Sequence, residues 1–258
     1  MFRYFIITKK TCIILGAVAL FLVFAIIIFS TKSVVISASQ SNRLLPIYST
    51  KRTNDKQISF SFDAAWGADD TQILIDTFAK YNIKVTFFVV GEWVDKFPDM
   101  VKALHDAGHE IQNHSNTHPH LTNLSKDKMI EEIKACNQKI KNITGVEPTL
   151  MRPPYGDYNN KVIEATESLG MYTIQWSVDS LDWKDLSATE ITNRVKSAIA
   201  PGGIVLFHNA AKHTPEALPT LIESLLSEGY EFVPISQLIY KENYTIDHTG
   251  MQIANTPT

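Results

Sequence analysis

This sequence has few cysteines and no excess of positive charge, and each of these features excludes a class of protein. Only two cysteines occur among the 258 residues. Cys12 lies in an apolar run and Cys136 in a helical pattern, which excludes a disulfide framework and leaves the fold to its core. The net charge of −3 provides no basic surface for nucleic acid, and no motif implies an obligate protein partner. The 45% hydrophobic composition fits one globular domain of roughly 200 residues with an appendage.

Long hydrophobic runs are also absent, with one exception near the N-terminus. All 18 residues from Cys12 to Phe29 are apolar or glycine. A helix of this length approaches the thickness of a bilayer's hydrocarbon core, about 30 Å. The apolar part of a cleaved secretory signal is usually about 7–15 residues, so we predict a cytoplasmic tip and an uncleaved transmembrane anchor over residues 1–30, with residues 12–29 in the membrane. Basic residues before the run place the N-terminus in the cytoplasm and the main domain outside a single-pass cell membrane. Small residues at 37–39 leave a cleaved, secreted form as the alternative.

Beyond the apolar run, strand-like and helix-like segments alternate. We predict a tether over residues 31–57, a domain over residues 58–240 and a C-terminal tail over residues 241–258. Seven strands are predicted in the domain: Ile58–Asp63, Lys84–Val90, Glu110–His114, Thr149–Pro153, Met171–Val178, Gly203–His208 and Glu231–Ile235. This alternation predicts an α/β fold with a parallel sheet. Because no G-x-G-x-x-G follows the first strand, we favour a distorted (β/α) barrel of about seven parallel strands, preceded by the transmembrane helix, over a doubly wound open sheet.

Polar side chains lie at or next to the C-terminal ends of five predicted strands. They are Asp63, His114, Arg152, Asp179 and His208. Any one of them alone would be typical of a cap or a surface residue. In a parallel barrel, however, the loops after the strands share one face, and that face carries the active site. The five residues together therefore predict a functional site there.

The segment HSNTH supplies two candidate metal ligands. His114 and His118 are four positions apart and would face the same way on a helical turn. Neutral imidazole is a good zinc ligand, and two histidines with one carboxylate are a common catalytic set. The spacing also arises by accident, so a polar loop without metal is the alternative.

Three other short segments combine polar residues with stiff or aromatic ones. RPPYG places Arg152 before two prolines, which fix the guanidinium and a backbone N–H in position. DSLDW adds two carboxylates and Trp183, whose indole either forms the wall of a sugar-sized groove or lies in the core. LFH ends an apolar strand in His208, an unusual choice unless the imidazole is needed there.

With SFDAAWG at the first strand end, these segments resemble in order and spacing the five motifs of the NodB-type polysaccharide deacetylases, carbohydrate esterase family 4. The resemblance covers residues 56–240 and is strongest to the sporulation-type deacetylases of spore-forming bacilli. It implies that a divalent metal, Zn²⁺ or Co²⁺, activates a water that removes N-acetyl groups from a cell-wall glycan such as peptidoglycan. Chitin or another exogenous glycan is the alternative substrate.

The resemblance also implies which residues handle the water. Asp63 would act as the general base, and Arg152 would support it. His114 and His118 would hold the metal. This agrees with the ability of a bound metal to lower the pKa of its water toward neutrality.

On the leaving-group side, the resemblance implies four more roles. The backbone N–H of Tyr155 would face the developing oxyanion. Asp182 would orient His208, which would protonate the leaving amine. Tyr155 and Trp183 would contact the substrate.

Ala64 departs from the family's pattern, because a metal-binding aspartate normally occupies this position. A methyl group cannot ligate zinc, so we expect weaker metal binding unless Asp69 or Asp70 of the same loop replaces the missing ligand. Two functions therefore stay open. One is a working amidase acting on N-acetylglucosamine or N-acetylmuramic acid, and the other is a membrane-tethered glycan-binding protein that has lost turnover. The retained acid and base favour the enzyme, because binding alone requires neither.

Overall fold

The computed structural model describes residues 18, 20–22 and 43–255. Most of the predicted anchor, and residues 31–42 of the predicted tether, lie outside this description. Among the residues that are described, no helix is both long and apolar enough to cross a membrane. The chain divides into two units, and the unit that begins at Leu45 contains every motif discussed above.

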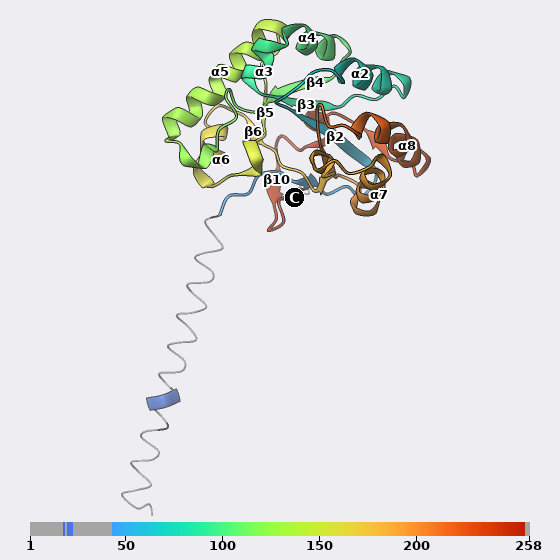
Figure 1. Cartoon of the computed structure of the whole chain (residues 1–258). Helices are drawn as coiled ribbons and strands as arrows, with labels where there is room; N and C mark the ends of the chain where they lie inside the picture. Colours follow the sequence, from blue (N-terminus) through green and yellow to red (C-terminus); the bar gives the residue numbers. More distant parts are fainter. Residues whose placement is uncertain (1–17, 19, 23–42, 256–258) are drawn as a thin grey trace, which may run out of the picture. The chain divides into compact units, whose positions relative to one another are not determined.

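A curved sheet of parallel strands forms the centre of this unit (Figure 1). Along the sheet the order is β6-β5-β4-β3-β2-β8-β7, and β9 pairs with β2 off this path. The strands are β2 (Gln57–Ala64), β3 (Thr86–Val89), β4 (Glu110–Asn113), β5 (Leu150–Met151), β6 (Tyr172–Thr173), β7 (Val178–Asp179), β8 (Ile204–His208) and β9 (Glu231–Phe232). All of their pairings are parallel. The seven strands of the path curl into a half-barrel, which confirms the predicted α/β class and parallel sheet.

One predicted strand is wrong. The segment Met171–Val178 forms two short strands, β6 and β7, at opposite edges of the sheet. Between them Ile174 pairs with Ile47 in an isolated bridge, and the Gln175 N–H donates to the Ile47 carbonyl at 2.7 Å. The apolar run is therefore divided because a distant segment takes its hydrogen bonds.

Helices cover the outer face of the curved sheet (Figure 1). They are α2 (Thr71–Lys80), α3 (Gly91–Lys96), α4 (Pro98–Asp106), α5 (Lys126–Thr144), α6 (Asn160–Glu167), α7 (Ala188–Ala198) and α8 (Thr214–Ser227). The short α9 (Ile235–Leu238) instead packs with Phe88 and Ile204, which point to the other face of the sheet. Three 3₁₀ turns, η1 (Leu121–Asn123), η2 (Pro154–Gly156) and η3 (Asp182–Lys184), lie in the connections. The longest helix, α5, illustrates why the helices form. The Ser125 side chain caps its first turn by accepting the Lys128 N–H, and Gly145 ends it in the left-handed region at φ 74°.

Strand β2 separates the apolar core from the polar interior of the sheet. Successive side chains on a strand point to opposite faces. Phe60, Phe62 and Ala64 belong to the apolar cluster shared with helices α2, α4 and α8, and all three are fully buried. The alternate residues Ser61 and Asp63 are also buried, but they contact polar groups on the other face.

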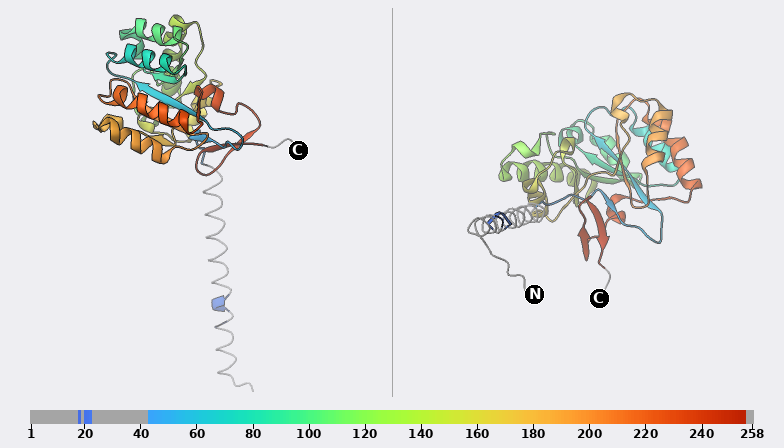
Figure 2. Two further views of the ribbon diagram at one scale, coloured as in Figure 1. Left: turned by 90° about the vertical axis from the view of Figure 1, so that its right-hand side faces the viewer. Right: turned by 90° about the horizontal axis from the view of Figure 1, so that it is seen from below.

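A second, three-stranded sheet in the order β1-β11-β10 adjoins the central one. It consists of β1 (Ser49–Thr50), β10 (Tyr244–Ile246) and β11 (Met251–Ala254), and Figure 2 shows the β10–β11 hairpin at one end of the unit. These strands fall in the predicted tether and tail. The folded unit therefore extends beyond residues 58–240 on both sides, because short polar-rich segments find their partners only in the folded chain.

Candidate active site

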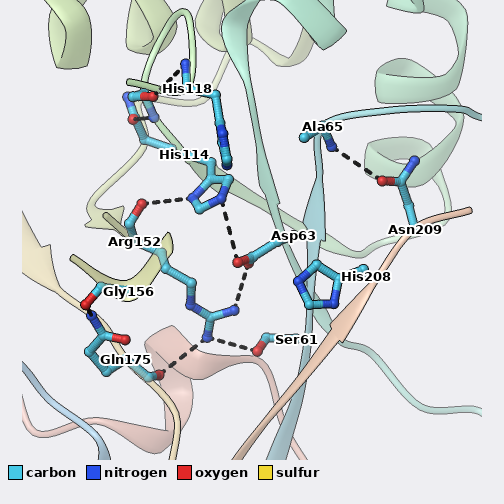
Figure 3. A network of polar contacts seen from close by, with 12 residues as sticks. Ser61, Asp63, Ala65, His114, His118, Arg152, Gly156, Gln175, His208 and Asn209 are labelled. Carbon is cyan, nitrogen blue, oxygen red and sulfur yellow. Dashed lines mark hydrogen bonds and ion pairs between the residues drawn. The ribbon is translucent and has the colours of Figure 1, made fainter. Parts of the chain in front are cut away.

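Asp63 is the last residue but one of strand β2, and a buried ion pair holds its side chain. Its Oδ1 accepts a hydrogen bond of 2.7 Å from Arg152 Nη1, and the two side chains are 8% and 0% exposed. Arg152 also donates to Ser61 Oγ at 2.8 Å and to the Gln175 carbonyl at 3.2 Å (Figure 3). Burial alone would raise the pKa of Asp63, but the charge of Arg152 and its hydrogen bond hold the pKa below its usual value. The carboxylate is thus anionic at neutral pH.

The two imidazoles of HSNTH lie side by side next to this carboxylate. Their ring centroids are 4.9 Å apart. His114 Nδ1 lies 2.8 Å from the Arg152 carbonyl, which can only accept, so Nδ1 carries the hydrogen and Nε2 keeps its lone pair. His114 Nε2 lies 3.5 Å from Asp63 Oδ2. Burial lowers the pKa of His114 and lowers that of His118 to about 4, so both rings are neutral at neutral pH.

A resident metal would find an incomplete set of ligands at this place. The described chain holds no group of three or more His, Cys, Asp or Glu side chains placed to bind a metal ion. His114 and His118 provide two neutral donors, whereas catalytic zinc sites commonly have three protein donors. Asp63 is engaged with Arg152, and Ala64 lies in the apolar cluster. The residues present therefore do not fit the complete metal site that the resemblance implies.

The two carboxylates considered as replacement ligands are turned elsewhere. Asp70 is buried, and its Oδ2 accepts the Ala210 N–H at 2.8 Å. Its Oδ1 has no hydrogen-bond partner among the described residues, and burial raises its pKa. Asp69 is exposed to solvent. Asp70 thus ties the loop after β2 to the loop after β8 and does not join the imidazole pair.

His208 lies on the other side of Asp63 from His114 (Figure 3). Its Nδ1 is 2.8 Å from Asp182 Oδ1, while Asp182 Oδ2 accepts the His208 backbone N–H and the Thr214 hydroxyl, each at 2.8 Å. Burial opposes the protonation of His208, but the hydrogen bond and charge of Asp182 outweigh it and raise the pKa of this histidine. Asp182 thus stabilises the protonated form of His208, with the additional proton on Nε2.

Asp179, the remaining strand-end residue, does not point into the site. Its Oδ1 accepts the Leu181 N–H at 2.8 Å, so its side chain stabilises the turn that follows β7. That turn brings in Asp182 instead.

Tyr155 occupies an unusual backbone conformation at the rim. Its φ of 61° lies in the left-handed region, which a residue with a side chain rarely adopts. His120 stacks on its ring at 4.1 Å between centroids, and His118 meets it edge-on at 4.5 Å. His120 is in turn held by Asp157, whose Oδ2 is 3.1 Å from its Nδ1. His120 is a rim residue that the sequence interpretation did not single out.

Exposed aromatic rings surround the mouth of the site. Trp66, Tyr155 and Trp183 are each more than half exposed. Trp66 lies 6.2 Å from His118 and 6.1 Å from His208, measured between ring centroids. Trp66, Trp183 and His208 line a hollow of about 380 Å³. Trp183 therefore does not lie in the core, and Trp66 is a rim residue that the sequence interpretation missed although it stands in SFDAAWG.

Comparison with known proteins agrees with this arrangement. A family profile described as polysaccharide deacetylase matches residues 50–174. The chain is 33% identical over 214 residues to the peptidoglycan-N-acetylmuramic acid deacetylase PdaA of Bacillus subtilis, covering 80% of this chain and 81% of that protein. The chain belongs to the polysaccharide deacetylase family.

Other deacetylases of the family share the same region. The peptidoglycan-N-acetylglucosamine deacetylase PgdA of Listeria monocytogenes is 39% identical over 188 residues, which cover 73% of this chain. The match spans only 40% of the length of that relative. Members of this family are generally metal-dependent, whereas the described residues of this chain offer no group of three donors.

Solved structures of the family include proteins with and without activity. A CE4 family pseudoenzyme from Bacillus anthracis has a TM-score of 0.73 and 33% identity, over 76% of this chain and 69% of that chain. A mutant of that pseudoenzyme, described as having restored enzymatic activity, has a TM-score of 0.72 and 34% identity, over 76% and 71% of the two chains. Likeness to the family therefore does not by itself decide whether this deacetylase-like site turns over substrate.

Proposed function

We propose that this protein removes N-acetyl groups from the amino sugars of a cell-wall polysaccharide such as peptidoglycan. The observation that carries the proposal is the pairing of an anionic base with a protonatable acid. Asp63 and His208 are register partners on the adjacent strands β2 and β8. Each has its own charged partner, Arg152 for the base and Asp182 for the acid. A protein that only bound glycan would need neither of these buried ion pairs.

The reaction follows from the protonation states of these groups. Asp63 takes a proton from the water whose oxygen attacks the acetamido carbonyl carbon. The carbonyl oxygen gains negative charge, which the backbone N–H of Tyr155, the first N–H after two prolines, is proposed to bind. His208 then gives its proton to the amide nitrogen as the C–N bond breaks. The products are acetate and a free amino sugar.

The exposed aromatic rim supports a glycan as substrate. Trp66, Tyr155 and Trp183 present flat apolar faces beside polar groups, a composition suited to the faces and hydroxyls of sugar rings. The named deacetylases similar to this chain act on peptidoglycan, as their names state. We propose the same substrate class here and a role in sporulation, with the domain outside the cell membrane and the N-terminus in the cytoplasm. His114 and His118 are the proposed donors to Zn²⁺ or Co²⁺.

The second candidate is a membrane-tethered protein that binds glycan without turnover. It is favoured by one observation, the alanine at position 64 in place of a third metal donor. The similarity to a CE4 family pseudoenzyme from Bacillus anthracis also supports it.

One experiment separates the two candidates. The full-length protein in detergent is incubated with peptidoglycan, and released acetate, bound glycan and bound zinc and cobalt are measured together, with His208→Ala as the control. Acetate release that His208→Ala abolishes would support the deacetylase. Glycan binding equal in both forms, without acetate, would support the binding protein. Neither binding nor release would reject both.

A further inference from the structure

The loop that carries the two imidazoles is bent into a conformation that needs external support. Ser115 and His118 have φ values of 66° and 58°, in the left-handed region. Both residues have side chains, for which this region is unfavourable. One bond inside the loop, from the His118 N–H to Ser115 Oγ at 3.1 Å, helps to close the turn. The rest of the support comes from two helices.

Helix α3 holds one side of the loop by its first backbone N–H groups. The Gly91 N–H donates to the Ser115 carbonyl at 3.0 Å, and the Glu92 N–H donates to the Asn116 carbonyl at 2.9 Å. A Cβ atom at position 91 would lie 2.3 Å from Asn116 Oδ1 and 3.0 Å from Asn116 Cα, so glycine allows this close approach without displacing Asn116. These bonds satisfy the carbonyl groups of Ser115 and Asn116, and the N–H groups of Asn116 and Thr117 take another partner.

That partner is Glu132 on helix α5. Its Oε2 accepts the Asn116 N–H at 2.9 Å and the Thr117 N–H at 2.8 Å. Its Oε1 accepts the Thr117 hydroxyl at 3.0 Å. Within residues 43–255, no Lys, Arg or His nitrogen lies within 4.0 Å of this carboxylate, so its charge serves these three bonds alone. Hydrogen bonds to an ionised acceptor are stronger than those between neutral groups.

Helix α5 is itself fixed to the strand that precedes the loop. Asn113 Nδ2, at the end of β4, donates to the Ile133 carbonyl at 2.8 Å and to Asn137 Oδ1 at 2.6 Å. The Asn113 Oδ1 in turn accepts the Ser115 N–H at 2.7 Å. Glu132 therefore acts from a helix whose distance from β4 is set by buried bonds.

We propose that Glu132 is a positioning residue that holds the HSNTH loop so that the His118 imidazole stands between His114 and Tyr155. It touches no reacting group and acts only through the loop. The expected effect on glycan binding rests on the proposed function. The expected effect on the histidine NMR signals does not depend on that function.

The test compares three variants of the full-length protein by NMR of the histidine ring C–H groups. Glu132→Ala removes all three acceptors, and we expect displaced signals for His118 and His114 and at least about tenfold weaker binding of peptidoglycan fragments. Glu132→Gln keeps a neutral oxygen where Oε2 lies, and we expect most of the wild-type signals and affinity to return. Glu131→Ala is the matched control, because Glu131 precedes Glu132 on the same helix and, among the described residues, pairs only with Lys128 across one turn. If Glu132→Ala does not fold, Glu132→Asp, which is one methylene shorter, takes its place.

The outcomes separate positioning from general stability. Unchanged His114 and His118 signals in Glu132→Ala would overturn the proposal, even if its melting temperature fell. Displaced signals in Glu131→Ala as well would overturn it too, because the effect would not be specific to the loop contact. If only Glu132→Ala displaces the signals and the wild-type protein binds no glycan, the positioning role is supported and the proposed function is rejected.

Discussion

Replacing Ala64 by aspartate would place a carboxylate at a position that is fully buried in the wild-type protein. The Ala64 side chain is 0% exposed and lies in the apolar cluster, with Val89 as its register partner on β3. Without metal, the new carboxylate has no partner of opposite charge on this face. We expect Ala64→Asp to lower the free energy of unfolding by about 2–4 kcal/mol, which corresponds to a melting temperature lower by about 5–15 °C for a domain of this size.

Zinc is expected to reverse this loss. With His114 and His118, the added carboxylate would complete a set of two histidines and one aspartate. The added side chain stands at the end of β2, from where we expect it to turn toward the ion. An ion that binds only the folded state at 1,000 times its dissociation constant adds about 4 kcal/mol of stability. The melting temperature of Ala64→Asp is therefore expected to rise by about 10 °C or more with zinc, whereas that of the wild type rises less.

The measurement is thermal unfolding with and without chelator, combined with zinc and cobalt affinity and acetate release. Ala64→Asn is the matched control, because it has the same size and no charge. Equal stability of wild type and Ala64→Asp without metal, or an equal response of Ala64→Asn and Ala64→Asp to zinc, would refute the reasoning. Tighter metal binding with faster acetate release would identify a weakened enzyme, and tighter binding without release would identify a glycan-binding protein.

Three further predictions concern the acid, the base and the membrane. Asp63→Asn and His208→Ala are each expected to lower acetate release by about 10²-fold or more, and normal release from either variant would contradict the assignment. Asp63→Asn is also expected to lower the free energy of unfolding by about 3–5 kcal/mol, because it leaves the charge of Arg152 buried and unpaired. Because Asp182 raises the pKa of His208, the protonated form of His208 persists to higher pH than for a free histidine, and turnover falls only as the pH rises through that pKa. In Asp182→Asn the loss of turnover is therefore expected at lower pH, and an unchanged pH profile would exclude the Asp182–His208 pair as the acid. The full-length protein is expected to stay with membranes through carbonate washing, and removal of residues 1–44 to release it; release of the full-length protein would favour the cleaved form.

The sequence predicted the site's central residues because their positions follow from local pattern. Asp63, His114, Arg152 and His208 each close or nearly close a strand, and parallel strands bring such ends to one face. The structure brings these four together. Their roles stay predictions, since geometry alone does not measure turnover.

Other features escaped prediction because they depend on contacts between distant segments. Glu132 reads as one of many helix-surface acids, and its partners lie 15 and 16 positions away across a turn. The stacking of His120 on Tyr155 requires the left-handed backbone of RPPYG, which no periodicity reveals. Ile47 is nearly fully buried within a polar-rich stretch, so its place in the folded unit was not visible from composition.

The three-stranded sheet has a mechanical consequence for a chain that is held at its N-terminus. β1 lies parallel to β11, and the backbone bonds Tyr48 N–H to Gly250, Thr50 N–H to Gly202 and Lys51 N–H to Gln252 succeed one another along it. A force applied to the chain on the N-terminal side of β1 acts on these bonds together, along the direction of the strand. Only then does the force act on β2. A force transmitted through the proposed N-terminal anchor would thus act on the bonds of β1 first, and it would reach the strand that carries Asp63 only after these bonds had broken.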